Sequence, residues 1–124
     1  MNRVHMAEYL DLDLESERWH CHSCGHDIGD ARQNYKRGLL VYDREPSEVH
    51  RPLIEGEYTF SPNPEWIRII EFYCPGCGRQ VECEYLPPGH PITYDTEVDV
   101  ESLKRRVSTG ELKVNDEGKL EVTA

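Results

Sequence analysis

The sequence predicts a small, β-rich α+β domain that resembles an elaborated zinc ribbon. Three observations lead to this prediction. Two Cys-x-x-Cys pairs, Cys21/Cys24 and Cys74/Cys77, lie in polar segments with adjacent glycines. Several short stretches either alternate apolar and polar residues or are rich in β-branched and aromatic residues, as strands are. The chain has 124 residues, enough for one domain with a modest hydrophobic core.

The first half of the chain contains only short predicted elements. Residues 9–15 alternate leucine with acidic residues, which predicts a half-buried strand. Residues 30–37 are polar and predict one or two helical turns that end at Gly38. Residues 39–42 form an apolar run and predict a short strand. Residues 45–65 contain several prolines, which disfavour regular structure, so we expect a long surface loop there.

The second cysteine pair is expected at the tip of a β-hairpin. Residues 66–73 (WIRIIEFY) form the stretch with the strongest strand preference, and they lead directly into Cys74. After Cys77, residues 81–85 alternate again and predict a strand that returns from the turn. The predicted unit is therefore strand, cysteine turn, strand.

A helix and a second hairpin are expected after this unit. Asp99 is placed to cap a helix, and Gly110 is placed to end it. Apolar residues on either side of the Asn-Asp-Glu-Gly turn at 115–118 predict a terminal β-hairpin.

We expect a single zinc-binding domain in three parts. Residues 1–17 would form an amino-terminal arm, residues 18–95 the zinc-ribbon-like core, and residues 96–124 the carboxyl-terminal helix and hairpin.

The two cysteine pairs predict one zinc ion with Cys21, Cys24, Cys74 and Cys77 as its ligands. Zinc takes four ligands at tetrahedral positions, and thiolates are well suited to it. A site closed by four thiolates has no position for water and carries a formal charge of 2 − 4 = −2. We therefore interpret the zinc as structural and predict no catalytic residue in this chain.

Some side chains near the cysteines receive other expected roles. Cys83 lies on the apolar face of a predicted strand, where a free cysteine acts as a small packing residue. Four aromatic residues flank the cysteine turns, and we expect them to form the core that covers the metal, with the alternative that some face a partner: Trp19, Trp66, Tyr73 and Tyr85.

Two alternatives for the cysteines remain open from the sequence. His20, His22 and His26 lie beside the first pair, so a histidine could replace one cysteine as a ligand. Either pair could instead form a redox-active dithiol, although neither opens a helix within a βαβ pattern, where a thioredoxin-like motif belongs.

Charge and motif content exclude several function classes. Lys and Arg total 14 against 24 Asp and Glu, and a net charge of −10 argues against binding to nucleic acid or to an anionic membrane. The sequence has no long apolar run, no secretory signal and no phosphate-binding or hydrolase motif. We expect a cytoplasmic protein whose partners are other proteins.

A longer constellation of residues resembles a specific family, the small γ-type subunits of acetone and acetophenone carboxylases, with the acetophenone type more similar. The similar region runs from about residue 18 to residue 95. Its matching positions are Trp19-x-Cys21-x-x-Cys24-Gly25-His26-Asp27, Tyr35-Lys36, Pro64-x-Trp66-x-x-Ile69-x-x-Phe72-x-Cys74-Pro75-x-Cys77-Gly78 and Pro88-x-x-Pro91-x-x-x-Asp95.

The resemblance implies an accessory subunit of a cytoplasmic, biotin-independent complex. Such complexes use ATP and bicarbonate to carboxylate a ketone to a 3-oxo acid. Large subunits similar to hydantoinase A and B hold the nucleotide, the catalytic metal and the substrate. The small subunit holds one zinc and packs against them. An alternative function from the residues alone is a free zinc-ribbon adaptor in transcription or RNA handling, which the acidic charge disfavours.

Overall fold

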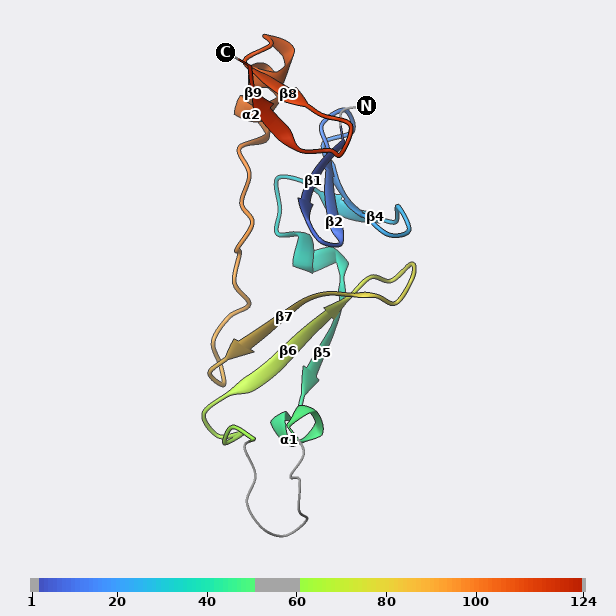
Figure 1. Ribbon diagram of the computed structural model, residues 1–124. Coiled ribbons are helices and arrows are strands. Elements are labelled where there is room, and N and C mark those ends of the chain that lie inside the picture. The colour runs from blue at the N-terminus through green and yellow to red at the C-terminus, as the bar shows by residue number, and fades with distance from the viewer. Residues whose placement is uncertain (1–2, 51–60, 124) are drawn as a thin grey trace.

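The computed structural model describes residues 3–50 and 61–123, and it confirms a β-rich α+β fold (Figure 1). A four-stranded sheet and the carboxyl-terminal hairpin lie at one end of an elongated molecule, and a three-stranded sheet lies at the other. An extended stretch between β7 and α2 runs alongside and connects the two ends (Figure 1).

The first sheet is an antiparallel meander in which each strand pairs with the next one along the chain. The alternating leucines predicted as a strand lie in and just after β2, and all three are buried. They pack around Trp19, which is fully buried and donates its indole N–H to the carbonyl of Gln33 at 3.0 Å. The strands are β1 (Arg3–Ala7), β2 (Leu10–Asp13), β3 (Arg18–Cys21) and β4 (Asp27–Asp30).

The second sheet confirms the predicted hairpin around the second cysteine pair. Its order is β5-β6-β7, and both pairings are antiparallel. A 3-10 turn, η1 (Tyr35–Gly38), connects the first sheet to the second. The strands are β5 (Leu40–Arg44), β6 (Arg68–Tyr73) and β7 (Gln80–Leu86).

The carboxyl-terminal elements also match the prediction. Helix α2 (Val100–Ser108) is capped by Asp99, whose carboxylate accepts the N–H of Ser102 at 3.0 Å. Gly110 follows the helix with a φ of 83°, a left-handed conformation that favours glycine. Strands β8 (Leu112–Val114) and β9 (Leu120–Val122) form the terminal hairpin.

The structure differs from the sequence predictions at several positions. The segment expected as an arm contains β1 and β2, both of which are strands of the first sheet. The proline-rich segment begins with a short helix, α1 (Pro46–Val49), and residues 51–60 lie outside the described part of the chain.

The aromatic core is smaller than expected. Trp66 is 74% exposed, because β6 begins only at Arg68 and leaves Trp66 in the preceding turn. Tyr85 is also exposed, and only Trp19 of the four predicted aromatic residues is fully buried.

A buried ammonium group joins the two sheets and the extended connection. The Lys36 side chain lies in η1 and is almost completely buried. Its Nζ donates to Glu84 of β7 at 2.7 Å and to the carbonyl of Thr93 at 3.1 Å, and Asp95 lies 3.3 Å away. It also lies over the ring of Phe72, 5.2 Å from the centroid. Three separate segments thus meet at one charge.

Replacing Gly38 with alanine is expected to destabilise the fold. A Cβ at this position would overlap the backbone carbonyl of Ile28 in β4, and backbone cannot move away as cheaply as a side chain. We expect Gly38→Ala to lower the free energy of unfolding by about 3 kcal/mol or more in urea denaturation. Gly89→Ala is the matched control, because no atom lies within 4 Å of its Cβ and only its φ of 81° opposes the change. Equal losses in both variants would contradict the prediction.

Replacing Lys36 with methionine is expected to cost about 3–5 kcal/mol, because Glu84 and Asp95 would keep their charges without a buried counter-ion. Lys113→Met, on the exposed side of β8, should change stability by less than about 0.5 kcal/mol. Adding Glu84→Gln to Lys36→Met should recover part of the loss in a double-mutant cycle. Independent, additive losses would show that the two side chains do not interact.

Candidate metal centre

Two β-hairpin turns with the same backbone hydrogen bonds present the four cysteines. In the first, between β3 and β4, the N–H of Gly25 donates to the carbonyl of Cys21 at 2.8 Å. In the second, between β6 and β7, the N–H of Gly78 donates to the carbonyl of Cys74 at 2.8 Å. Both glycines have φ near +75° to +78°, which an L side chain rarely adopts. The glycine after each cysteine pair therefore closes the turn.

The structure brings the four sulfurs together from the two sheets. Cys21 Sγ lies 3.8 Å from Cys77 Sγ, and Cys24 Sγ lies 3.6 Å from Cys74 Sγ. All four sulfur atoms lie within 4.8 Å of one another. Four thiolates at about 2.3 Å from a tetrahedral zinc would be separated by about 3.8 Å. The cluster therefore has the dimensions of a four-thiolate metal site.

Burial and backbone N–H groups act on these thiols in opposite directions. Cys21 and Cys74 are buried, and burial raises the pKa of both thiols above the ordinary value. Cys77 is exposed, and the backbone N–H of Arg79 lowers the pKa of its thiol. The N–H of Gly76 points at Cys74 Sγ at 3.3 Å, where it would stabilise a thiolate. A metal ion would replace the protons that the buried thiols otherwise keep.

Gly76 lets the two turns approach each other. A Cβ at this position would lie 2.9 Å from Cβ of His26 and 3.1 Å from Cys24 Sγ, both in the opposite turn. Carbon atoms do not approach that closely without displacing one another. Glycine at 76 is thus required for the cysteine pairs to meet, and not only for the shape of its own turn.

The neighbouring histidines do not belong to this cluster. His22 Nδ1 lies 2.8 Å from the carboxylate of Asp11, and His20 donates from Nδ1 to the carbonyl of Gly25 at 3.1 Å. Within the described part of the chain, the sulfur group contains only the four cysteines. Cys83 is partly buried in β7 and lies outside the group, as predicted.

A second group of possible ligands was not predicted from the sequence. His5, Asp11 and His22 place one ligand atom each within 4.8 Å of one another. The sequence did contain a signal for Asp11, which is an acidic residue between two leucines of a predicted strand. In the structure Asp11 is buried in that strand. His5 carried none, because β1 was not predicted.

In the described ranges 3–50 and 61–123, we find no helix with the length and apolar character needed to cross a membrane.

The fold and the site define a class: a β-rich, zinc-ribbon-like domain in which two Cys-x-x-Cys turns from separate sheets form one potential metal site. A family model described as acetone carboxylase gamma subunit matches residues 4–108. The chain belongs to this acetone carboxylase gamma subunit family.

Two relatives are consistent with this membership. The acetophenone carboxylase beta subunit of Aromatoleum aromaticum is 58% identical over 118 residues, which cover 95% of this chain and 91% of the relative. The acetone carboxylase gamma subunit of Xanthobacter autotrophicus is 30% identical over 90 residues, 71% of this chain and 52% of the relative. This chain therefore matches about half of the longer acetone carboxylase subunit. The acetophenone-type relative is named a beta subunit, where the resemblance in sequence suggested a gamma name.

Replacing Cys77 with serine is expected to remove the bound metal. Cys77 is exposed, so the change removes a ligand while leaving the buried packing of Cys21 and Cys74 in place. We expect purified Cys77→Ser protein to contain less than about one tenth of the metal of the unmodified protein by elemental analysis, with a lower melting temperature, because metal binding and folding are coupled. Cys83→Ser is the matched control and should keep its metal. Metal retained in Cys77→Ser would show that this cysteine is not a ligand.

Proposed function

We propose that this chain is the zinc-binding accessory subunit of an ATP-dependent, biotin-independent ketone carboxylase. Family membership is the observation that carries the proposal, since both relatives are named as subunits of a ketone carboxylase. The sulfur cluster supports a structural role, because a metal with four thiolate ligands offers no open position to a substrate.

Zinc is the ion that best fits the cysteine cluster. Four soft sulfur donors in a tetrahedral arrangement favour zinc over magnesium, calcium or manganese, which prefer oxygen. The ion would bind Cys21 and Cys24 of the first sheet together with Cys74 and Cys77 of the second. Its contribution is mechanical, since it holds the two sheets in one orientation.

The reaction itself would take place on partner subunits. We infer that large hydantoinase A- and B-like chains bind ATP, a second metal and the ketone, and that bicarbonate supplies the carboxyl group of the 3-oxo acid. This chain would contribute no catalytic group and would work in the cytoplasm with its partners, in a hetero-oligomer.

We infer that one face of the second sheet contacts a partner subunit through exposed side chains of its two edge strands, while Ile69 and Glu71 of the central strand are already buried on this face. Leu40 and Tyr42 of β5 pair with Tyr73 and Glu71 of β6, so their side chains share one face of the sheet with Tyr85 of β7. Leu40 is 58% exposed, Tyr42 44% and Tyr85 46%. The opposite face carries Phe72, which is fully buried beside Lys36.

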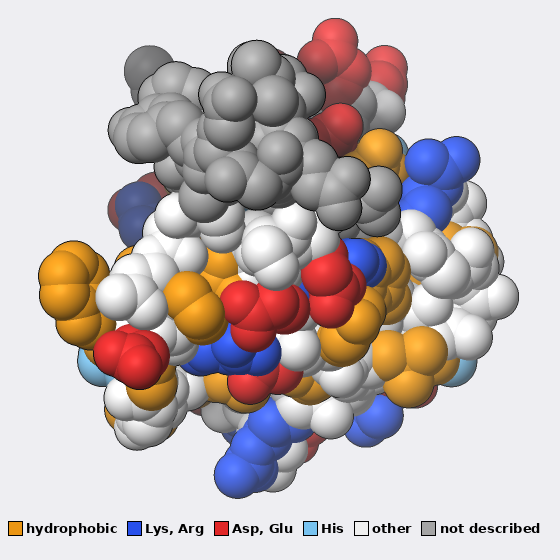
Figure 2. Space-filling view, turned by 90° about the horizontal axis from the view of Figure 1, so that it is seen from below, with side chains coloured by type: hydrophobic (Ala, Val, Ile, Leu, Met, Phe, Trp, Pro, Cys, Tyr) orange, Lys and Arg blue, Asp and Glu red, His pale blue; other side chains and the backbone are white. Residues whose placement is uncertain are grey.

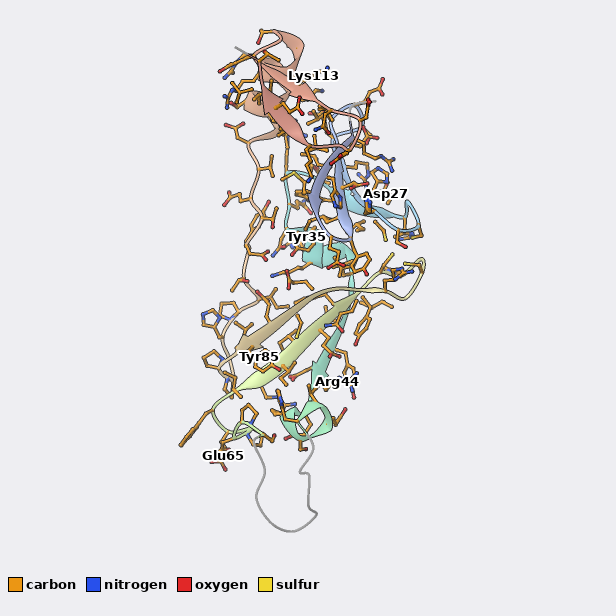
Figure 3. All side chains as sticks on the ribbon, viewed as in Figure 1. Asp27, Tyr35, Arg44, Glu65, Tyr85 and Lys113 are labelled. Atoms are coloured by element: carbon orange, nitrogen blue, oxygen red, sulfur yellow. The ribbon has the colours of Figure 1, made fainter. Side chains whose placement is uncertain are left out.

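Charged side chains surround these apolar groups. Arg44 donates to Glu71 at 2.7 Å and to Glu48 at 3.0 Å, and its guanidinium lies over the ring of Tyr42. Figure 2 shows this end of the molecule, where apolar side chains alternate with acidic and basic ones. Arg44 and Tyr85, labelled in Figure 3, belong to β5 and β7, the two strands that flank β6 in the sheet. Apolar and paired charged side chains are thus mixed on this face, a composition that protein interfaces also have.

Introducing a charge on this face is expected to weaken assembly. Leu40→Asp should weaken binding to the large subunits by about tenfold or more in a co-purification titration, since an unpaired carboxylate would be buried at the interface. Val122→Asp is the matched control, because Val122 is 76% exposed on β9 and lies away from the second sheet. Both variants should keep their zinc. Equal binding by the two variants would place the interface elsewhere.

Reconstitution tests the function itself. Purified large subunits should carboxylate acetone or acetophenone with ATP and bicarbonate only when this chain is present, and Cys77→Ser should not replace the unmodified chain. Full activity of the large subunits without this chain would contradict the proposal. Salt-sensitive binding to RNA or DNA, with no affinity for the large subunits, would instead support the adaptor function.

A further inference from the structure

A second cluster of potential metal-binding side chains lies on the first sheet, beside the carboxyl-terminal hairpin. His5 of β1, Asp11 of β2 and His22, which follows β3, converge there. They form one wall of a hollow of about 310 Å³, and the turn between β8 and β9 forms the other. Figure 1 shows this turn against the amino-terminal strands.

Backbone hydrogen bonds hold the three side chains in register. His5 and Asp11 are directly paired residues of β1 and β2, so their side chains leave the same face of the sheet. The N–H of His22 donates to the carbonyl of Tyr9 at 3.0 Å, which fixes this residue beside the β1–β2 turn. The convergence therefore follows from strand pairing and does not depend on a mobile side chain.

The spacing of the donor atoms fits the ligands of one metal ion. Asp11 Oδ1 lies 3.0 Å from His5 Nδ1 and 2.8 Å from His22 Nδ1. Two ligands bound at about 2.1 Å are about 3.0 Å apart in octahedral geometry and about 3.4 Å apart in tetrahedral geometry, so small side-chain shifts would admit either. The two imidazole rings have their centroids 4.0 Å apart, so both nitrogens reach the same side of the carboxylate.

The burial of Asp11 favours a positive charge beside its carboxylate. Asp11 is 7% exposed, and a buried carboxylate is costly unless a cation neutralises it. Its ion pairs within the described part of the chain are with the two histidines alone. The guanidinium of the nearby Arg3 lies 3.7 Å from the carboxylate of Asp13, the residue of β2 that pairs with Arg3.

The hairpin turn supplies further oxygen atoms around the hollow. Asp116 and Glu117 line it, and the carbonyl of Gly118 accepts the N–H of His5 at 2.8 Å. A side chain at 118 would lie 3.3 Å from both the Arg3 carbonyl and Cβ of His5, so glycine lets the turn approach β1. Open coordination positions of an ion would face these carboxylates and the water between them.

We infer that His5, Asp11 and His22 bind a second divalent transition metal ion, distinct from the ion at the cysteines. Two imidazoles and one carboxylate form a donor set of intermediate hardness, which suits Zn²⁺, Fe²⁺ or Co²⁺ better than Mg²⁺ or Ca²⁺. The ion completes the neutralisation of Asp11 and leaves free positions toward the β8–β9 turn. The chain then carries one closed sulfur site and one open nitrogen and oxygen site.

Metal titration of the full-length chain with its cysteine site already filled by zinc tests this inference. Elemental analysis after equilibration with micromolar Zn²⁺ should give two ions per chain. Titration of the one-zinc protein with Co²⁺ should produce visible absorption without the intense sulfur-to-cobalt charge-transfer bands that a thiolate site gives. The same titration should shift the ring resonances of His5 and His22 in NMR spectra.

Variants separate a metal site from a cluster that is only hydrogen-bonded. His22→Ala removes an exposed ring and should leave the fold intact, yet it should weaken Co²⁺ binding by more than about tenfold. Asp11→Asn, which keeps the size of the side chain, should do the same. His90→Ala, at an exposed histidine outside the hollow, should bind as the unmodified protein does.

One ion per chain at saturating Zn²⁺, or equal Co²⁺ affinity in His22→Ala and the unmodified protein, would overturn the inference and leave a hydrogen-bonded cluster. The inference would also be overturned if the visible Co²⁺ absorption disappeared in Cys77→Ser and persisted in His22→Ala. The Co²⁺ would then occupy the sulfur site.

Discussion

The fold depends on one juxtaposition: four sulfur atoms, two from each sheet, lie within 4.8 Å of one another. Neither sheet can complete the cluster alone, because Cys21 and Cys24 belong to the first and Cys74 and Cys77 to the second. Protonated thiols attract one another only weakly, and a cation bound by all four sulfurs would turn this contact into a strong link. Gly76 makes the contact sterically possible, and the glycines at 25 and 78 shape the two turns.

A buried charge provides the second link between the same parts. Lys36 reaches from η1 to Glu84 in the second sheet and to Thr93 and Asp95 in the extended connection. Tyr35, beside it, lies between the two sheets in Figure 3 and donates its hydroxyl to Asp95 at 3.2 Å. The carboxylates of Asp95, Glu82 and Glu84, together with burial, raise the pKa of Tyr35 well above its ordinary value, so it remains a donor. The cysteine cluster and the ion pairs of Lys36 thus lie at the same junction of the fold.

The sequence predicted what depends on local pattern. Cysteine spacing identified the four sulfurs that the fold brings together, alternation located β2 and β7, and the Asp99 cap located α2. Positions that depend on distant neighbours could not be predicted. Trp66 was expected in the core by residue type but precedes its strand. Nothing near Lys36 in the sequence indicates its burial, because its carboxylate partners lie 48 and 59 residues later. His5 lies in a segment without a strand pattern, so its proximity to Asp11 could be seen only once the pairing of β1 with β2 was known.

The hydrogen bond between His5 and Gly118 joins β1 to the β8–β9 turn. The hollow beside His5 has walls from both of these parts, so it exists only when the hairpin is docked against the first sheet. A change that loosens the hairpin would therefore open the hollow without touching the four cysteines. The environment of the His5 ring is thus a direct reporter of how the carboxyl-terminal hairpin packs.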